Sequence, residues 1–267
     1  MIARSYLYVP GDRPERFTKA LSSGSDAVIF DLEDAVPVAA KVDARLSVAD
    51  ALGSSNDSRT EAWVRTNSGH LGLDDVKAIV ALPGLTGIVV PKATPDALGE
   101  ILDMACGVQV CALVESAVGV LSMAAIAGLP GVSRLALGEV DLVADLAMTP
   151  SSDGRELWPI RLSAVVASVA YGRLAPVGPV WIDVRDLDGL KASTEALRRA
   201  GFGARQAIHP SQVEIINDAL LPTAEELERA AHVLDLAAQA GGGACVDENG
   251  RMIDEAVLRS ARRIIEF

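Results

Sequence analysis

Short apolar runs rich in β-branched residues recur along the chain between Ser5 and Ile208. Most of these runs are continuously apolar rather than alternating, which is typical of parallel strands covered on both faces. We therefore predict eight buried strands, at Ser5–Val9, Ala27–Phe30, Ala62–Arg65, Gly87–Val90, Val108–Val114, Arg134–Leu137, Val180–Ile182 and Gln206–Ile208.

Segments with helical periodicity separate these runs, at Asp96–Cys106, Gly119–Ala127, Leu157–Tyr171 and Leu187–Ala200 among others. The order strand, helix, strand, helix predicts an α/β fold, and eight such units suit a (β/α)₈ TIM barrel, which typically takes about 250 residues. A doubly wound open sheet is the alternative. It would be favoured by a Gly-rich phosphate-binding turn after the first strand, but Val9–Pro14 contains no GxGxxG pattern.

The pattern changes after His209-Pro210. Thr223 and Glu226 form a capping box that opens a helix running to about Ala240, and Gly241–Gly243 breaks it. Asn249-Gly250 indicates a tight hairpin, and a last helix begins at Asp254. We predict a barrel at residues 1–221 and a C-terminal helix and lid segment at 222–267, which packs on the barrel or on a neighbouring subunit because it is too small to have its own core.

Composition narrows the class of protein. Half of the 267 residues are apolar and 22% are charged, so a disordered protein is excluded. The net charge of −12 argues against nucleic acid as a partner. Three cysteines, Cys106, Cys111 and Cys245, have no paired or metal-binding spacing and are interpreted as small core residues of a reducing compartment. No export signal is found, so we expect a cytoplasmic protein.

One apolar stretch resembles a membrane helix. From Gly107 to Val132 the only charge is Glu115. The stretch divides at Glu115-Ser116 into a β-branched half and an Ala-rich half, which is typical of a buried strand followed by a helix. We therefore expect no membrane span.

Charged side chains follow several predicted strands. Catalytic groups of a TIM barrel sit at the C-terminal ends of the strands. Five carboxylates at one rim would repel one another without a cation, and oxygen ligands select a hard divalent metal such as Mg²⁺. The three histidines do not indicate zinc. The residues at these ends are Asp31, Glu33, Asp34, Arg65, Asn67, Lys92, Glu115 and Asp141.

Each of these residues also has a structural interpretation. Glu115 and Asp141 suit the first turns of the helices that follow them. Arg65 can neutralise Asp31 or Asp34, Lys92 can be a solvated strand end, and Asp254 is a good N-cap. Spacing alone leaves these alternatives open.

A series of motifs in a fixed order carries a resemblance that spans nearly the whole chain. The segments that carry it are Arg4–Ala20, Asp26–Val36 with Lys41 and Ala44-Arg45, Val64–Asn67, Val90–Lys92, Leu113–Glu115, Gly138–Leu142, Ala207–Gln212 and Met252–Asp254. With these motifs the chain resembles the citrate lyase β-subunit-like proteins of the superfamily of acyl-CoA lyases and 2-keto-acid aldolases.

The resemblance implies roles for individual residues. Glu115 and Asp141 would be the two protein ligands of Mg²⁺, with Mn²⁺ as a substitute, and Arg65 would contact the thioester oxygen of the substrate. The acidic stretch Asp31–Asp34, which includes Glu33 and Asp34, would hold metal-bound water and orient Arg65. The remaining matches are Arg13, Arg16 and Lys19, which correspond to a basic helix that contacts CoA phosphates, and Asp254, which corresponds to a carboxylate that one subunit's lid lends to its neighbour.

The implied activity is a Mg²⁺-dependent carbon–carbon lyase. It would cleave or form a 3-hydroxyacyl-CoA, such as citryl-, citramalyl- or malyl-CoA, into an acyl-CoA and a 2-keto acid or glyoxylate. The implied assembly is a homo-oligomer, a trimer or a hexamer built from trimers. Two other functions stay open: a metal-dependent aldolase acting on free 2-keto acids without CoA, and a non-catalytic acyl-CoA-binding protein or subunit of a lyase complex.

The chain departs from its relatives at two places. Ala204-Arg205 stands where Gly-Lys is common, which we expect to alter CoA contacts. Ala147-Met148 stands where a glycine often follows the preceding Ala-Asp-Leu, which we expect to reshape the pocket wall near the metal.

Overall fold

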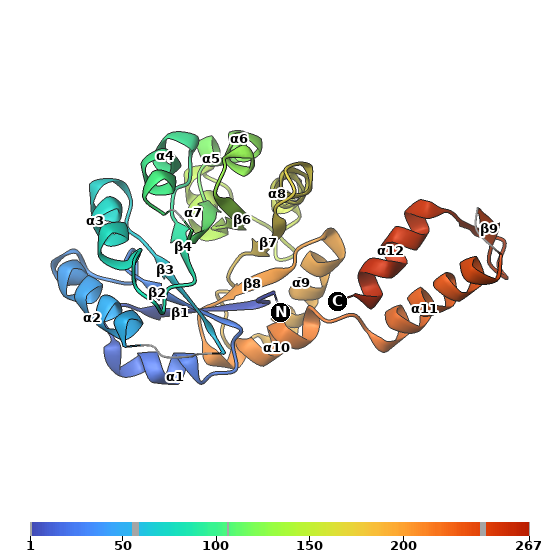
Figure 1. Ribbon diagram of the computed structural model, residues 1–267, viewed down its shortest axis with the longest axis horizontal. Coiled ribbons are helices and arrows are strands. Elements are labelled where there is room, and N and C mark those ends of the chain that lie inside the picture. The colour runs from blue at the N-terminus through green and yellow to red at the C-terminus, as the bar shows by residue number, and fades with distance from the viewer. Residues whose placement is uncertain (1, 55–58, 106, 241–243, 267) are drawn as a thin grey trace. The chain divides into compact units, whose positions relative to one another are not determined.

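The computed structural model describes residues 2–54, 59–105, 107–240 and 244–266. Its first compact unit, Met1–Leu220, is a closed barrel of eight parallel strands in which each strand pairs with the next and the last pairs with the first. Figure 1 shows helices around this barrel. The predicted TIM barrel is confirmed. Its strands are β1 (Ser5–Pro10), β2 (Ala27–Asp31), β3 (Glu61–Arg65), β4 (Gly87–Val90), β5 (Gln109–Val114), β6 (Val132–Leu137), β7 (Leu174–Gly178) and β8 (Ala204–Ala207).

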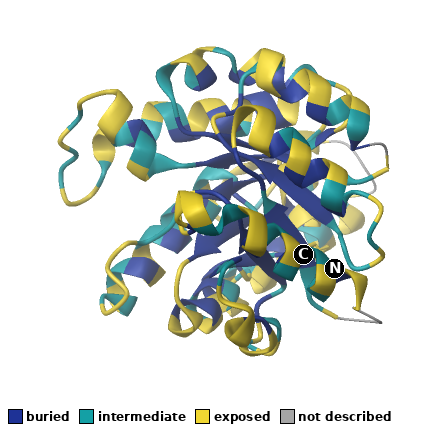
Figure 2. Ribbon diagram, turned by 90° about the vertical axis from the view of Figure 1, so that its left-hand side faces the viewer, coloured by how far each residue is buried: buried dark blue, intermediate teal, exposed yellow. Residues whose placement is uncertain are grey.

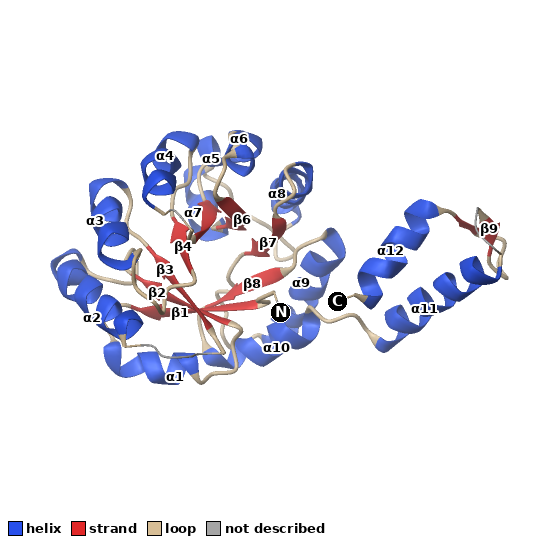
Figure 3. Ribbon diagram, viewed as in Figure 1, coloured by secondary structure: helices blue, strands red, loops and turns tan. Residues whose placement is uncertain are grey.

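Ten α-helices of the described residues lie in this unit, outside the strands (Figure 3). The N-cap predicted at Thr94 is present, because its hydroxyl accepts a hydrogen bond from the backbone N–H of Ala97 at 3.2 Å. The helices are α1 (Phe17–Leu21), α2 (Lys41–Gly53), α3 (Gly69–Ile79), α4 (Pro95–Met104), α5 (Ala117–Leu121), α6 (Met123–Gly128), α7 (Glu139–Asp145), α8 (Trp158–Ala170), α9 (Leu187–Ala200) and α10 (Val213–Ala219), with short 3₁₀ turns η1 (Pro14–Arg16), η2 (Val38–Ala40), η3 (Arg155–Leu157) and η4 (Pro210–Gln212).

Alternate residues of most strands belong to two different buried clusters. Ile29 and Trp63 lie in a small cluster that includes Tyr6, Cys111 and Val177. Val28 and Phe30 lie in the large cluster that packs the strands against the helices. Burial on both faces explains why the strands are continuously apolar, and in Figure 2 the strands are accordingly dark while the outer faces of the helices are exposed.

The seventh strand lies elsewhere than predicted. It is Leu174–Gly178, and the predicted Val180–Ile182 forms a loop in which Ile182 is 73% exposed. Pro176 interrupts the apolar run at 174–178. The pairing of β6 with β7 shifts register just there, between the pairs Arg134↔Leu174 and Ala136↔Val177, and an irregular position is where a strand tolerates proline.

The apolar stretch that resembles a membrane helix forms β5 followed by α5 and α6, as predicted. No helix among the described residues has the length and apolar character to cross a membrane. Cys111 is buried, in agreement with its predicted core role, and Cys245 is half-buried, while Cys106 lies outside the described residues.

The second compact unit, Leu221–Phe267, is described by itself. It contains α11 (Ala224–Gln239), a two-stranded antiparallel hairpin of β9 (Cys245–Val246) and β10 (Met252–Ile253), and α12 (Glu255–Ile265). The capping box of Thr223 and Glu226 is present with both of its hydrogen bonds. The hairpin is confirmed, and the triple glycine Gly241–Gly243 lies outside the described residues.

Candidate active site

A pocket of about 450 Å³ opens at the C-terminal ends of the barrel strands. Asp31 and Arg65 are the last residues of their strands, whereas Asp34, Glu115 and Asp141 lie in the segments that directly follow strands, as is usual for a barrel of this type. Several of the predicted site residues come together here. The lining comprises Tyr8, Pro10, Asp31, Asp34, Ala35, Arg65, Leu113, Glu115, Leu137, Gly138, Glu139, Val140, Asp141, Val180, Gln206 and Ile208.

Arg65, the last residue of β3, is held on three sides. Its Nε and Nη2 each donate to a different oxygen of the buried Asp31 at 2.7 Å. Its Nη1 lies 3.1 Å from Glu33 Oε2 and 3.7 Å from Asp34 Oδ2, and the guanidinium lies 5.0 Å from the centre of the Tyr8 ring. Burial opposes the charge, but the hydrogen bonds that Arg65 donates to Asp31 outweigh the burial and raise the pKa of Arg65. Arg65 is thus a fixed, fully charged donor facing the pocket.

Glu33 is shared between two cations. Its Oε1 accepts from Lys92 Nζ at 2.7 Å, and its other oxygen faces Arg65. Glu33 is only 5% exposed, so burial raises its pKa while Lys92 and Arg65 act in the opposite direction. Although its side chain is half exposed, Lys92 is therefore more than the solvated strand end that its sequence position allows.

Glu115 follows β5 and is buried beside the backbone that follows the neighbouring strand β4. Its Oε1 accepts from the backbone N–H of Lys92 at 2.7 Å. Burial raises the pKa of Glu115 to about 7, despite this hydrogen bond. A Cβ atom at Gly138 would lie 2.6 Å from Glu115 Oε2, so only glycine leaves room for the carboxylate at that position.

Asp141, in the first turn of α7, lines the same pocket. Its negative charge contributes to the raised pKa of Glu115. The side-chain carboxylate of Asp141 forms no hydrogen bond or ion pair with any residue that the structure describes.

Glu115 and Asp141 face one pocket, and neither forms an ion pair with a described residue, so the two carboxylates fit a hard divalent ion. Mg²⁺ commonly takes one or two carboxylates from a protein and completes its shell with water and substrate oxygens. Within the described ranges no group of three or more His, Cys, Asp or Glu side chains forms a complete metal cage. The donor set at Glu115 and Asp141 therefore fits the open type of site.

Comparison with known proteins agrees with this geometry. The family model described as HpcH/HpaI aldolase/citrate lyase matches residues 4–210. The chain belongs to this family. Its members include carbon–carbon lyases, and we place the chain in that enzyme class.

Individual relatives cover nearly the whole chain. A citrate lyase subunit beta-like protein of Mycobacterium tuberculosis is 35% identical over 97% of this chain and 93% of its own length. A (3S)-malyl-CoA thioesterase of Cereibacter sphaeroides is 31% identical over 98% and 93%. The crystal structure of CitE from M. tuberculosis with magnesium, acetoacetate and coenzyme A superposes with a TM-score of 0.86 at 32% identity, covering 99% of this chain and 97% of that one.

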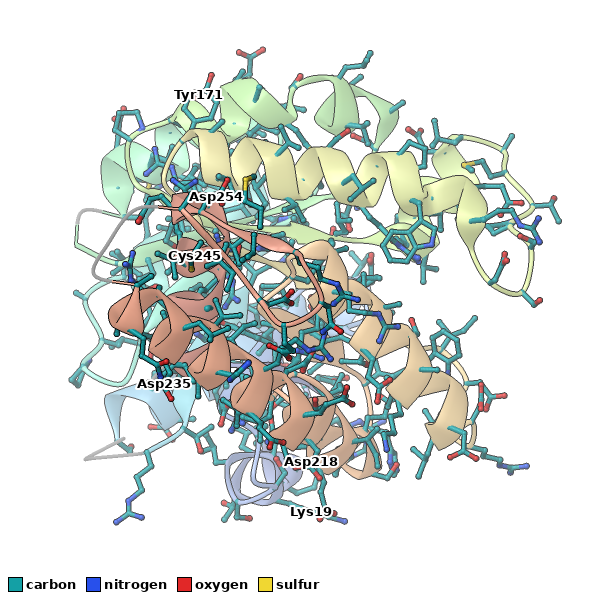
Figure 4. All side chains as sticks on the ribbon, turned by 90° about the vertical axis from the view of Figure 1, so that its right-hand side faces the viewer. Lys19, Tyr171, Asp218, Asp235, Cys245 and Asp254 are labelled. Atoms are coloured by element: carbon teal, nitrogen blue, oxygen red, sulfur yellow. The ribbon has the colours of Figure 1, made fainter. Side chains whose placement is uncertain are left out.

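The predicted CoA-binding residues lie away from the pocket lining. Arg13, Arg16 and Lys19 belong to or precede η1 and α1, and all three are exposed. Arg16 Nε lies 4.0 Å from Glu15, and Lys19 is labelled on α1 in Figure 4. They form a basic surface segment directly after β1, and their assignment to CoA stays a prediction.

Asp254 belongs to the second unit, where it caps α12 (Figure 4). Its Oδ1 accepts from the backbone N–H of Val257 at 3.0 Å. Asp254 is therefore an N-cap, as its position in the sequence allows, and its catalytic role stays a prediction.

The two departures from the family pattern have different consequences. Arg205 is 1% exposed, donates to Thr194 Oγ1 at 2.8 Å and Pro179 O at 3.0 Å, and lies 5.6 Å from the Trp181 ring. Its side chain thus lies within the barrel wall, and the expected change in CoA contacts stays a prediction. Ala147 has a φ of 48°, a left-handed conformation that glycine adopts more easily.

Three polar groups of the site are missing from the sequence prediction. Tyr8 donates to Gln206 Oε1 at 2.8 Å, and these two residues of β1 and β8 form part of the pocket lining. Glu139 accepts from Arg161 in two hydrogen bonds of 2.6 and 2.7 Å. A signal for Tyr8 and Gln206 exists, because each is a polar side chain within a predicted strand, Ser5–Val9 and Gln206–Ile208.

Proposed function

We propose that this chain is a Mg²⁺-dependent lyase that cleaves or forms a 3-hydroxyacyl-CoA, with an acyl-CoA and a 2-keto acid or glyoxylate as the other reactants. The observation that carries the proposal is the juxtaposition of the fixed Arg65 with Glu115 and Asp141 in one pocket. The magnesium, acetoacetate and coenzyme A bound by the M. tuberculosis relative support it.

Glu115 and Asp141 would hold the ion. Bound there, Mg²⁺ supplies a Lewis acid and a template for the carboxylate and adjacent oxygen of a keto acid. The oxygen of Glu115 that does not accept from Lys92 is the one available for this task.

Arg65 would stabilise the enolate oxygen of the acyl thioester that forms when the carbon–carbon bond breaks. Such stabilisation requires a donor that does not move as charge develops. Asp31 and Glu33 meet this requirement by holding the guanidinium at 2.7 and 3.1 Å. Asp34, which is 58% exposed and 3.7 Å away, contributes less to this alignment.

A panel assay tests the reaction class. Citryl-, citramalyl- and malyl-CoA would be incubated with enzyme and Mg²⁺ while the free keto acid or glyoxylate and free CoA are measured separately. Release of the keto product with the thioester intact supports the lyase. Release of free CoA alone would instead identify thioester hydrolysis, the activity named for the C. sphaeroides relative.

The alternative of an aldolase on free 2-keto acids predicts a different result, because such an enzyme leaves the CoA thioesters of this panel uncleaved. Such an enzyme cleaves substrates without CoA and ignores added CoA. Titration of CoA by calorimetry, with Arg13→Ala and Arg16→Ala as variants, separates the two. Tight CoA binding that both substitutions weaken supports the acyl-CoA lyase, whereas no CoA binding in the intact protein contradicts it.

We further propose that Asp254 protonates the enolate carbon from an adjacent subunit, which requires an oligomer such as a trimer. The family resemblance supports this role. Asp254→Asn keeps a good N-cap but removes the proton-transfer group. We expect an inactive variant, and mixing it with an Arg65→Ala variant should restore part of the activity in hybrid oligomers. Normal turnover by Asp254→Asn would leave this residue with capping alone.

A further inference from the structure

Lys92 contacts two carboxylates of the site, Glu115 and Glu33, with two different groups. Its backbone N–H donates to Glu115 Oε1 at 2.7 Å, and its ammonium donates to Glu33 Oε1 at 2.7 Å. Glu115 is the proposed metal ligand and Glu33 orients Arg65. A single residue therefore fixes one carboxylate through its backbone and a second through its side chain.

The backbone of Lys92 is strained. Its φ of 48° lies in the left-handed region, and Ala147 is the one other non-glycine residue with a positive φ within the described ranges. Non-glycine residues in this region are destabilising and persist where surrounding contacts determine their conformation.

The strain is confined to one residue. Val90 pairs with Ala112 of β5, and the backbone N–H of Ala93 donates to Leu113 O at 3.0 Å, so the ladder between the strands resumes directly after Lys92. Pro91 has no N–H to offer. The left-handed turn thus takes the N–H of Lys92 out of the ladder and directs it to Glu115.

We propose that Lys92 is a positioning residue whose left-handed backbone holds Glu115 in its metal-binding orientation and whose ammonium holds Glu33 against Arg65. The metal half of this proposal rests on the proposed function. The proposal makes two separable claims, because the backbone conformation and the ammonium can be changed independently.

The backbone claim is tested by replacing Lys92 with Gly, Asn, Ala and Val, all of which lack the ammonium. Glycine and asparagine accept the left-handed conformation, alanine accepts it less well, and β-branched valine resists it. Mg²⁺ affinity is measured by calorimetry on the metal-free proteins. We expect Lys92→Gly and Lys92→Asn to stay within about threefold of the unaltered protein and Lys92→Val to lose about tenfold or more, the scale of a lost outer contact to a metal ligand.

The ranking of the four variants decides this claim. The claim is supported if Mg²⁺ affinity falls in the order in which the four residues accept the left-handed conformation. Equal Mg²⁺ affinity in all four variants overturns it. If Lys92→Val does not fold, the comparison of alanine with glycine and asparagine still decides. Lys77→Met removes an exposed lysine of α3 that pairs with Asp74 and serves as the control, with unchanged affinity.

The ammonium claim is tested by turnover. In Lys92→Gly we expect kcat to fall about tenfold or more while Mg²⁺ affinity is kept, because Glu33 loses its second cation and no longer holds Arg65. Lys92→Arg should recover most of kcat. If Lys92 had a structural role alone, its replacement would lower the melting temperature, but kcat would not fall while Mg²⁺ affinity is kept. Unaltered kcat in Lys92→Gly overturns the claim.

The outcome for the proposed function is read separately. If the unaltered protein binds Mg²⁺ and Glu115→Ala does not, a flat Lys92 series contradicts the role of Lys92 alone. If the unaltered protein does not bind Mg²⁺, the proposed metal site is wrong and the backbone claim fails with it.

Discussion

The two sides of the pocket differ in how their negative charges are balanced. On the Arg65 side, Asp31, Glu33 and Asp34 face the guanidinium, and Glu33 has Lys92 as a second cation. On the Glu115 side, Glu115 and Asp141 form no ion pair with any described residue.

This difference indicates which part of the site the protein completes by itself. The Arg65 side is a finished network whose donors are already fixed, as expected of a group that stabilises developing charge. The Glu115 side is a pair of like charges whose burial raises the pKa of Glu115 to about 7. A pair of this kind is stabilised by a bound cation, so we expect the first side to serve the chemistry and the second to serve metal binding.

The largest effect should come from changing Arg65 on the completed side. In Arg65→Lys we expect kcat to fall by about 100- to 1,000-fold, as for loss of one oxyanion donor, because lysine lacks the planar fork that holds Asp31 and faces the substrate at once. Mg²⁺ affinity, measured by calorimetry, should stay within about threefold of the unaltered protein. A variant with near-normal kcat would reduce Arg65 to a counter-ion.

Asp31→Asn changes the residue that accepts two hydrogen bonds from Arg65 on the same side of the pocket. A neutral amide cannot accept both guanidinium hydrogen bonds, so we expect the free energy of unfolding to fall by about 3 kcal/mol, the scale of a broken buried pair. Urea denaturation measures it. The control Asp74→Asn removes an exposed acid that pairs with Lys77 and should cost less than about 1 kcal/mol. Equal losses in both variants would show that the Arg65 network contributes no more than a surface pair.

The pH dependence of the metal-free protein tests the unbalanced side. The folded protein binds more protons than the unfolded chain between about pH 4.3, where an ordinary Glu titrates, and the raised pKa of Glu115 near 7. The contribution of Glu115 to the free energy of unfolding therefore falls as pH rises through this window, by at most about 1.4 kcal/mol per pH unit.

The raised pKa of Glu33 acts in the same direction, so the measured quantity is the difference from Glu115→Gln. We expect urea denaturation in a chelating buffer to give a steeper fall for the unaltered protein than for this variant. Parallel curves would contradict the raised pKa of Glu115.

The smallest effect concerns Ala147, which follows α7 on the Glu115 side. Glycine at this left-handed position removes about 1–2 kcal/mol of strain but adds about 0.4–1 kcal/mol of unfolded-chain entropy, so Ala147→Gly should stabilise by about 0.5 kcal/mol. Ala144→Gly, within α7, should destabilise by about 0.5–1 kcal/mol. Thermal unfolding compares them, and destabilisation by both would show that Ala147 is not strained.

Sequence reasoning predicted the fold more completely than it predicted which acidic and basic side chains of the site pair with one another. Seven of the eight strands begin and end within two residues of their predicted bounds, and most of them do so because burial on both faces gives them continuous apolar runs. The seventh strand was misplaced because Pro176 interrupts its run. The eighth begins earlier, at Ala204, because the fully buried Arg205 looks like a surface residue in the sequence.

Catalytic groups of a TIM barrel lie at the C-terminal ends of its strands, and this rule predicted that several charged residues lie at one rim. They are Arg65, Glu33, Asp34, Glu115 and Asp141. The rule could not predict which acid pairs with which cation, because those pairings depend on side-chain directions. The link from Lys92 to Glu115 was out of reach for the same reason, since it uses a backbone N–H that only a left-handed residue presents.

Calorimetric titration of Mg²⁺ into the metal-free protein tests the division of the pocket most directly. The unaltered protein and the exposed-acid control Asp74→Asn should bind Mg²⁺ with equal affinity, and both should gain stability by about 2.7 kcal/mol at a metal concentration 100 times Kd. Glu115→Gln and Asp141→Asn should lose measurable binding, whereas Arg65→Lys should keep it. Unchanged Mg²⁺ affinity in both carboxylate variants would contradict the assignment of the metal to the Glu115 side.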